Sequence, residues 1–334
     1  MIIQRTSTAI HISAPAKVNL FLEVLGKRTD GFHEVRTLLC PIGLFDQFHL
    51  EPTPHSDSID LQVLLPPGAD STESAWNIPS DQRNLVHRAV RCVQQMLAHR
   101  RPAAAGKTQS LSLCGCRIQL HKAIPATAGL GGGSSDAAAA VVASLLTWSH
   151  WDRQLAQDIC AEIGSDVSFF LGGIDGFGLA LASGRGEHCQ WLSNRPQLEF
   201  CITHPPVGCS TQQVYQSYVK PAVKRDTDKI VAACESGELK KIGAELFNAL
   251  QLSASMQTDW IDRQLQLFSA NGFSNTLMSG SGSSCFGLVD PDFCDRALQL
   301  RDQAQQMGLL RVYAVRAWYG DSIEQQLSRQ SSGS

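Results

Sequence analysis

A glycine-rich run in the middle of the chain has the composition of a phosphate-binding loop. Residues 125 to 136 read Pro-Ala-Thr-Ala-Gly-Leu-Gly-Gly-Gly-Ser-Ser-Asp. Glycines tolerate positive φ and lack the Cβ that would keep backbone N–H groups away from a bound anion. We expect Ser134 to Asp136 to open a helix, where unpaired N–H groups and the helix dipole favour a polyphosphate. The run therefore predicts nucleotide binding.

Two familiar glycine-rich loops fit this run poorly. A Walker loop needs a lysine after its last glycine, but Gly133 is followed by Ser134. A dinucleotide fingerprint needs a third glycine where Ser134 stands, and an acid that closes a second strand about 20 residues on. Asp152 has that spacing, but it precedes a segment with helical periodicity. A flexible linker is a weaker alternative, since linkers seldom join two strongly patterned elements so tightly.

Composition limits the class of protein. The chain has 334 residues, 43% hydrophobic and 18% charged, which is typical of a globular protein with about two domains. A net charge of −3 gives no support to a nucleic-acid or membrane surface. Neither a signal peptide nor an apolar stretch of membrane-spanning length is visible. The 11 cysteines show no paired metal spacing, so we expect them to be reduced in a cytoplasmic protein that binds small molecules.

The elements that must position this loop can be read from periodicity and turn residues. Alternation on one side predicts a strand over residues 111–121, and Ala-rich spacing on the other predicts a helix from Asp136 to about Leu146. The remaining expected strands are 10–13, 18–25, 48–51, 59–65, 177–182, 198–203, 276–278, 285–289 and 311–318. The remaining expected helices are 84–100, 152–163, 212–218, 227–247, 257–270 and one opened by Asp290 and Pro291 and ending near Met307.

This order of elements indicates an α+β fold of two domains. We expect an N-terminal ATP-binding domain over residues 1–190, with the boundary near 184–196, and a C-terminal substrate domain over 191–322. Residues 323–334 are expected to form a disordered tail, since they are polar and lie at a terminus.

Three separated motifs and one acidic segment carry a resemblance to a known family. The first motif is Ala14 to Leu22 together with Lys27 to Glu34, the second is the glycine-rich run, and the third is Met278 to Cys285. With Gly164-Ser165-Asp166-Val167, they resemble the GHMP small-molecule kinases over about residues 12–318. The resemblance implies a nucleotide domain of ribosomal-protein-S5 type with a left-handed βαβ unit, followed by a ferredoxin-like domain.

The resemblance also implies roles for named residues. Asp166 resembles the catalytic base of an alcohol kinase, and Lys17 resembles the lysine beside it, which offsets charge on the transferring phosphoryl group. ATP would be the donor with Mg²⁺, and Ser134 or Ser135 is a candidate ligand of the metal, although no acidic ligand is assignable. The residues implied to hold ATP phosphates are Pro125, Ala126, Thr127, Ala128, Gly129, Leu130, Gly131, Gly132, Gly133, Ser134 and Ser135.

The N-terminal motif is typical of a member that binds a small substrate with a cytidine diphosphate group. By resemblance, Asn19, Phe32, His33 and Tyr215 bind that substrate, since amide, imidazole and aromatic groups suit a pyrimidine. The family usually has tyrosine where Phe32 stands, so stacking is kept while a hydroxyl is lost. The C-terminal glycine loop, Ser279, Gly280, Ser281, Gly282 and Ser283, would close over the reacting groups. A monomer or weak homodimer is expected.

Two alternatives remain at this point. The chain could be a mevalonate-type or homoserine-type kinase or the related decarboxylase, but these relatives have no cytidine to recognise with Thr29 to His33. A nucleotide-binding module without activity is the other alternative. It would not require Lys17 and Asp166, and both are present.

Overall fold

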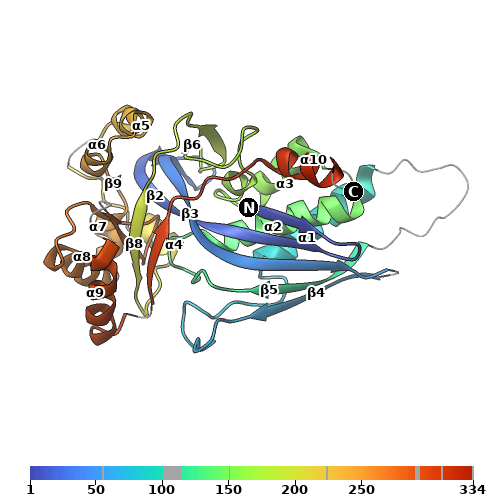
Figure 1. Cartoon of the computed structure of the whole chain (residues 1–334), viewed down its shortest axis with the longest axis horizontal. Helices are drawn as coiled ribbons and strands as arrows, with labels where there is room; N and C mark the ends of the chain where they lie inside the picture. The colour runs from blue at the N-terminus through green and yellow to red at the C-terminus, as the bar shows by residue number, and fades with distance from the viewer. Residues whose placement is uncertain are drawn as a thin grey trace, which may run out of the picture.

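The protein is built on two sheets, seen in a computed structural model that describes residues 1–54, 56–100, 114–149, 151–222, 225–289, 294–309 and 311–332 (Figure 1). The larger sheet holds all the strands up to β7, which ends at Trp191, together with the short β9, and the smaller sheet holds the remaining strands of the C-terminal part. The expected α+β class is confirmed.

The larger sheet has eight strands, and its main path runs in the order β1-β2-β3-β5-β4. β6 and β7 extend it beside β3, and β9 adds a short parallel pairing to β2. Its strands are β1 (Ile2–Arg5), β2 (Ile10–Lys27), β3 (His33–Pro52), β4 (Ser56–Leu64), β5 (Cys114–His121), β6 (Ala180–Ser183), β7 (His188–Trp191) and β9 (Phe247–Asn248).

β2 is one continuous strand, where two strands separated by a connection at residues 14–17 were expected. Pro15 breaks the periodicity of the sequence because it cannot donate a ladder hydrogen bond. In the sheet, Pro15 pairs with Phe45 while Ala16 pairs with Ile42, so the proline lies at a bulge where the ladder is already interrupted. Lys17 and Asn19 lie on this unbroken strand, and both are buried.

Three helices pack together on the larger sheet: α1 (Leu85–Arg100), α2 (Gly132–Trp148) and α3 (Arg153–Ile163). α2 contacts β2 and β3 directly, and its Ala137 to Ala140 segment is fully buried. It begins four residues before the expected Asp136, because Gly131 takes a left-handed conformation (φ +74°) as N-cap and leaves Gly132 and Gly133 inside the first turn. Asn84 and Asp152 cap α1 and α3, accepting from the Val86 and Leu155 N–H groups.

The smaller sheet has the order β10-β11-β8-β12 with every neighbouring pair antiparallel. This is the strand order of a ferredoxin-like domain, as expected. Its strands are β8 (Glu199–His204), β10 (Thr276–Met278), β11 (Cys285–Val289) and β12 (Arg311–Arg316). The helices of this half are α4 (Thr211–Gln216), α5 (Thr227–Ser236), α6 (Leu239–Ala244), α7 (Gln251–Ser255), α8 (Trp260–Ala270) and α9 (Cys294–Gln306).

The segment expected to form one helix over residues 227–247 instead forms the helices α5 and α6 and the start of the short strand β9. Gly237 ends α5 because it takes a left-handed conformation (φ +72°). The expected cap at Asp290 and Pro291 lies outside the described residues.

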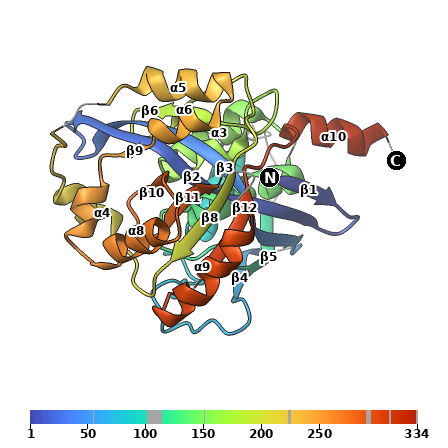
Figure 2. The same cartoon turned by 60° about the vertical axis from the view of Figure 1, so that its left-hand side comes forward.

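The expected disordered tail is wrong for residues 323–332, which form helix α10 (Ile323–Ser332). Ile323 is fully buried, and Gln326 bonds to the Ile3 N–H and the Met1 carbonyl. Glu324 also forms an ion pair with Arg153 of α3 (2.6 Å). Figures 1 and 2 both place the N-terminus beside this helix. Polar composition suggested disorder, but the glutamines satisfy the backbone of edge strand β1.

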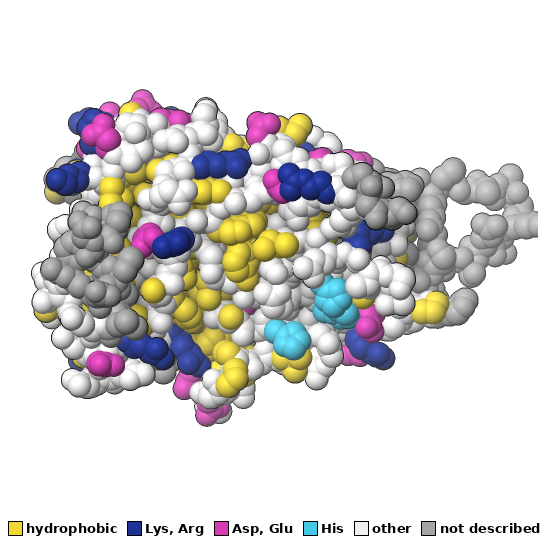
Figure 3. All heavy atoms as spheres, viewed as in Figure 1, with side chains coloured by type: hydrophobic (Ala, Val, Ile, Leu, Met, Phe, Trp, Pro, Cys, Tyr) yellow, Lys and Arg dark blue, Asp and Glu magenta, His cyan; other side chains and the backbone are white. Residues whose placement is uncertain are grey.

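The surface agrees with the small net charge of the chain. On the face shown in Figure 3, positive and negative side chains are interspersed among the described residues. Among the helices that the structure describes, none is long and apolar enough to cross a membrane.

Candidate active site

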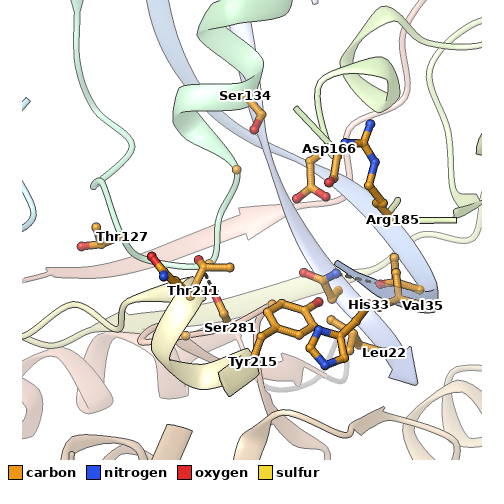
Figure 4. Close-up of a pocket in the computed structure, with 18 of the residues that line it drawn as sticks. Leu22, His33, Val35, Thr127, Ser134, Asp166, Arg185, Thr211, Tyr215 and Ser281 are labelled. Carbon is orange, nitrogen blue, oxygen red and sulfur yellow. Dashed lines mark hydrogen bonds between the residues drawn. The ribbon is translucent and has the colours of Figure 1, made fainter. Parts of the chain in front are cut away.

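Residues from both halves of the chain line one cavity of about 1080 Å³. Its walls come from β2, the start of β3, the glycine-rich run, the segment around Asp166, α4 and the loop before β11. Figure 4 shows Ser134 and Asp166 at one end of this cavity, with His33 and Tyr215 at the other. Side chains separated by long stretches of sequence are thus brought to a single site.

The glycine-rich run forms a tight loop that leads into α2. Gly129 and Gly131 have positive φ (+73° and +74°), and the Gly131 carbonyl accepts from the Ser135 N–H at 2.9 Å. A Cβ on Gly132 would lie 2.8 Å from a methyl carbon of Ile124, so the loop packs closely at this point. Gly131, Gly132, Gly133 and Ser134 line the cavity at the start of a helix. Backbone N–H groups in this position suit a phosphate.

A buried ionic cluster supports this loop from behind. The Lys122 ammonium donates to Asp46 and to Asp136 Oδ2 (2.6 Å), and Asp46 Oδ1 also accepts from the Ala123 and Ile124 N–H groups. Burial raises the pKa of Asp136 to about 8. The nearby Asp46 carboxylate also raises this pKa, whereas the positive charge of Lys122 lowers it. The cluster ties β3 to both ends of the loop. Spacing in the sequence gave no signal for it.

Lys17 contacts several groups at the end of the cavity that holds Asp166, which we call the reacting end. Its Nζ lies 3.4 Å from Asp166 Oδ2 and donates to Asn19 Oδ1 at 2.6 Å and to the Gly129 carbonyl at 3.0 Å. The Lys17 side chain is 4% exposed, whereas the Asp166 side chain is 32% exposed and open to the cavity. A nearly buried ammonium beside an accessible carboxylate can serve an alcohol that must lose a proton as it attacks a phosphate.

Asn19 has different partners from those expected of a substrate-binding residue. Although it lines the cavity, its Oδ1 accepts from Lys17 and its Nδ2 donates to Thr37 Oγ1 at 2.7 Å. Thr37 in turn donates to the Phe21 carbonyl. The amide is therefore engaged on both sides and orients the ammonium of Lys17.

Aromatic rings form the other end of the cavity. His33 and Tyr215 stack with ring centroids 5.1 Å apart, and Tyr218 meets His33 edge-on at 6.3 Å. Burial, and then the charge of Lys27, lower the pKa of His33, which favours the neutral imidazole. Phe32 is 51% exposed beside them, held in a turn by the bond from its N–H to Asp30 Oδ1. Neutral hydrogen-bonding groups and flat rings suit a nucleobase.

The C-terminal glycine loop meets the phosphate loop directly. Ser279 Oγ donates to the Gly129 carbonyl at 2.8 Å, and Asn248 Nδ2 donates to the Met278 and Gly280 carbonyls. Gly280, Ser281 and Gly282 line the cavity, and Ser281 exchanges a hydrogen bond with Thr211 of α4.

The structure brings most of the predicted site residues to this cavity, with four exceptions. Leu130, Ser135, Ser279 and Ser283 are buried behind its walls. Sequence reasoning missed several lining residues, namely Lys27, Thr37, Leu85, Ser165, Arg185, Thr211, Gln212 and Tyr218. Arg185 had a usable signal, since it stands between Gly184 and Gly186 in a turn, but the others are ordinary residues of strands, helices and the segments next to them.

The described residues contain no cluster of three or more histidine, cysteine or acidic side chains able to hold a metal ion. A metal that arrives with a nucleotide remains compatible with the donors here, since Mg²⁺ often keeps several waters and binds through substrate phosphates. Ser134 supplies a hydroxyl on the cavity wall.

The fold and the cavity suit a small-molecule phosphotransferase, and comparison with known families shows this class. The model for the GHMP kinases N terminal domain matches residues 84–175, and the model for the GHMP kinases C terminal matches residues 230–307. The chain belongs to the GHMP kinase family.

Individual relatives point to one kind of kinase within this family. The chain is 38% identical to a 4-diphosphocytidyl-2-C-methyl-D-erythritol kinase of Pelotomaculum thermopropionicum, over 83% of this chain and 88% of the relative. It is 34% identical to the kinase of the same name from Bacillus pumilus, over 89% and 98%. A crystal structure of 4-(cytidine 5'-diphospho)-2C-methyl-D-erythritol kinase superposes with a TM-score of 0.68 at 29% identity, covering 93% of this chain and 99% of that one.

Proposed function

We propose that this kinase transfers the γ-phosphoryl group of ATP to the 2-hydroxyl of 4-diphosphocytidyl-2-C-methyl-D-erythritol, a step of the non-mevalonate route to isoprenoid precursors. The observation that carries the proposal is a single cavity with a phosphate loop and a Lys17–Asp166 pair at one end and the His33–Tyr215 stack at the other. The names of the relatives support the same substrate.

The donor is held at the start of α2. Backbone N–H groups of Gly131 to Ser134 bind the ATP phosphates, and the helix dipole adds a favourable term. Mg²⁺ would be bound mainly by phosphate oxygens and water, with the Ser134 hydroxyl as its protein ligand, and would supply neutralisation of phosphate charge. Ser281 and its neighbouring glycines cover the reacting groups from the C-terminal half.

The acceptor is held at the opposite end. Its cytosine contacts the neutral imidazole of His33 and the rings of Tyr215 and Phe32, which places its hydroxyl toward Asp166. Asp166 accepts the hydroxyl proton as the oxygen attacks, while Lys17 stabilises the charge on the transferring group. Asn19 and the Gly129 carbonyl keep Lys17 in place.

A panel assay tests the proposal. Purified protein with ATP and Mg²⁺ is offered the cytidylylated methylerythritol, mevalonate or homoserine, and ADP release is measured. Turnover is expected with the first acceptor alone. D166N should lower kcat about 10²–10⁴-fold, the range for loss of a general base, while the KM for ATP changes little.

Turnover confined to mevalonate or homoserine would overturn the proposed acceptor. Solved homoserine and mevalonate kinases share the fold at 17% and 14% identity, so the fold alone does not separate these alternatives. Wild-type kcat in D166N would remove Asp166 from the role of base.

A further inference from the structure

Arg185 is a cation of the cavity wall to which the proposed mechanism assigns no role. It lies in the turn between β6 and β7, flanked by Gly184 and Gly186, which both have positive φ (+76° and +126°). A Cβ on Gly186 would lie 3.3 Å from Asp166 Oδ1. The turn is thus in close approach to the carboxylate at the reacting end, and Figure 4 shows the Arg185 side chain beside Asp166.

The guanidinium of Arg185 is held in a fixed place. Its Nη2 donates to the Ala161 carbonyl at 3.0 Å, its Nε lies 3.4 Å from Glu187 Oε1, and its Cζ lies 5.1 Å from the centre of the Phe32 ring. The side chain is 25% exposed. Among the hydrogen bonds between described residues, none uses Nη1, so two N–H groups of a preorganised fork remain for a ligand.

The turn that carries Arg185 therefore approaches both ends of the cavity. Arg185 contacts Phe32, on the side where the cytosine is placed, and its turn contacts Asp166, where the hydroxyl reacts. In a cytidine diphosphate-linked alcohol, the diphosphate separates the nucleoside from the alcohol carbons. A substrate that spans from Phe32 to Asp166 would bring its diphosphate within reach of the turn that carries Arg185.

The other cations of the cavity wall have different positions. Lys17 is committed to Asp166, Asn19 and the Gly129 carbonyl. Lys27 pairs with His33 across β2 and β3, at the end of the cavity where the cytosine is placed. A diphosphate anion needs a charged donor near its middle, and a guanidinium fork matches phosphate oxygens well.

We propose that Arg185 binds the diphosphate of the acceptor and makes the enzyme select acceptors linked through two phosphates. This inference rests on the proposed function, because it takes the acceptor's two ends from it. The ligand class is a nucleoside diphosphate ester, and the ATP phosphates at α2 are not involved.

Binding and kinetics of R185Q, R185K and R36Q test this inference. Arg36 offers a matched control because it is exposed on β3 between the cavity-lining residues Val35 and Thr37, so its side chain lies on the opposite face of the strand. Calorimetry measures the Kd of CDP and CMP, and steady-state assays measure the KM of the diphosphate acceptor and of ATP.

R185Q should weaken CDP binding and raise the acceptor KM about 10–150-fold, the range for loss of a charged hydrogen bond, with little change for CMP or for the KM of ATP. R185K should restore part of the loss because it keeps the charge without the fork. R36Q should resemble the wild type.

Equal weakening of CDP and CMP in R185Q, or an unchanged acceptor KM, would overturn the role of Arg185 while turnover by the wild type leaves the proposed function standing. Failure of the wild type to bind CDP or to use the diphosphate acceptor would overturn both.

Discussion

At the scale of single residues, the chain commits its polar groups to several partners at once. Lys17 has three partners within 3.4 Å, and two of them come from segments more than 100 positions away. Residue types alone allowed Asp166 to be a capping carboxylate or a base, because the sequence carries no information on distance. Family resemblance favoured the role of base, and the structure places the side chains of Asp166 and Lys17 together. The contact of Asn19 with Lys17 could not be predicted, since its other partner Thr37 was not visible as a site residue.

His204 gives the residue scale a prediction on pH. It is fully buried in β8, its Nδ1 lies 3.0 Å from Ser284 Oγ, and burial lowers its pKa to about 3. The unfolded chain binds a proton at this histidine below pH 6.5, while the folded chain does not until about pH 3. Stability from this group is therefore complete above pH 6.5 and declines as the pH falls, by about 1.4 kcal/mol per pH unit.

Urea unfolding at pH 6.5 and pH 5 measures this effect. Between these values the wild type should lose about 2 kcal/mol more of its free energy of unfolding than H204N does. Other histidines titrate in both proteins, so the difference isolates His204. Equal losses in the two proteins would show that His204 is not held neutral.

At the scale of elements, glycines and prolines decided where the sequence interpretation held. Element types were predicted well, and β10 and β11 have the expected bounds. Boundaries failed where one residue can have two meanings. Pro15 lies in a bulge and does not end a strand, Gly237 ends a helix that was expected to continue, and Gly131 caps α2 before the expected start. Tertiary pairing decides among these meanings, and local periodicity does not contain it.

Two glycines of the phosphate loop make opposite predictions. A Cβ on Gly129 would lie 2.0 Å from the Ser279 carbonyl oxygen, and Gly129 has positive φ, whereas Gly133 is helical and its Cβ would only reach Leu85 at 3.9 Å. G129A should lower the melting temperature by several degrees, because backbone strain costs about 1–3 kcal/mol and the clash adds to it. G133A should keep or raise it, since alanine is favoured in helices by up to about 1 kcal/mol. Scanning calorimetry without nucleotide checks both, and equal melting temperatures would contradict this account of the loop.

At the scale of the whole molecule, the α+β class with two domains could be predicted from the sequence. The packing of the C-terminal residues against the N-terminal strand could not. The polar tail gave no sign of α10, because its stability comes from Gln326 and Glu324 bonding to β1 and α3. Likewise, the Lys122 cluster joins residues 46, 122 and 136, and no local pattern relates them. Long-range polar contacts of this kind become visible only after the fold is assembled.

The Gly129 carbonyl joins three segments, since it accepts from both Lys17 Nζ and Ser279 Oγ, and Ser279 Oγ lies 3.3 Å from the Asn19 N–H. The glycine-rich phosphate loop, Lys17 and the C-terminal glycine loop are therefore joined through one hydrogen-bond acceptor. A ligand that orders one of them lowers the entropic cost of ordering the others for the next ligand. We expect positive cooperativity: the acceptor should tighten binding of a non-hydrolysable ATP analogue, and calorimetry with and without acceptor measures the factor.

Thermodynamic linkage makes this factor reciprocal, so the ATP analogue must tighten acceptor binding equally. S279A should bring the factor toward one while each ligand alone binds almost as before, and a factor of one in the wild type would contradict the expectation. We therefore expect a single carbonyl oxygen to couple the binding of the two substrates within one cavity, so that the complex with both bound is favoured.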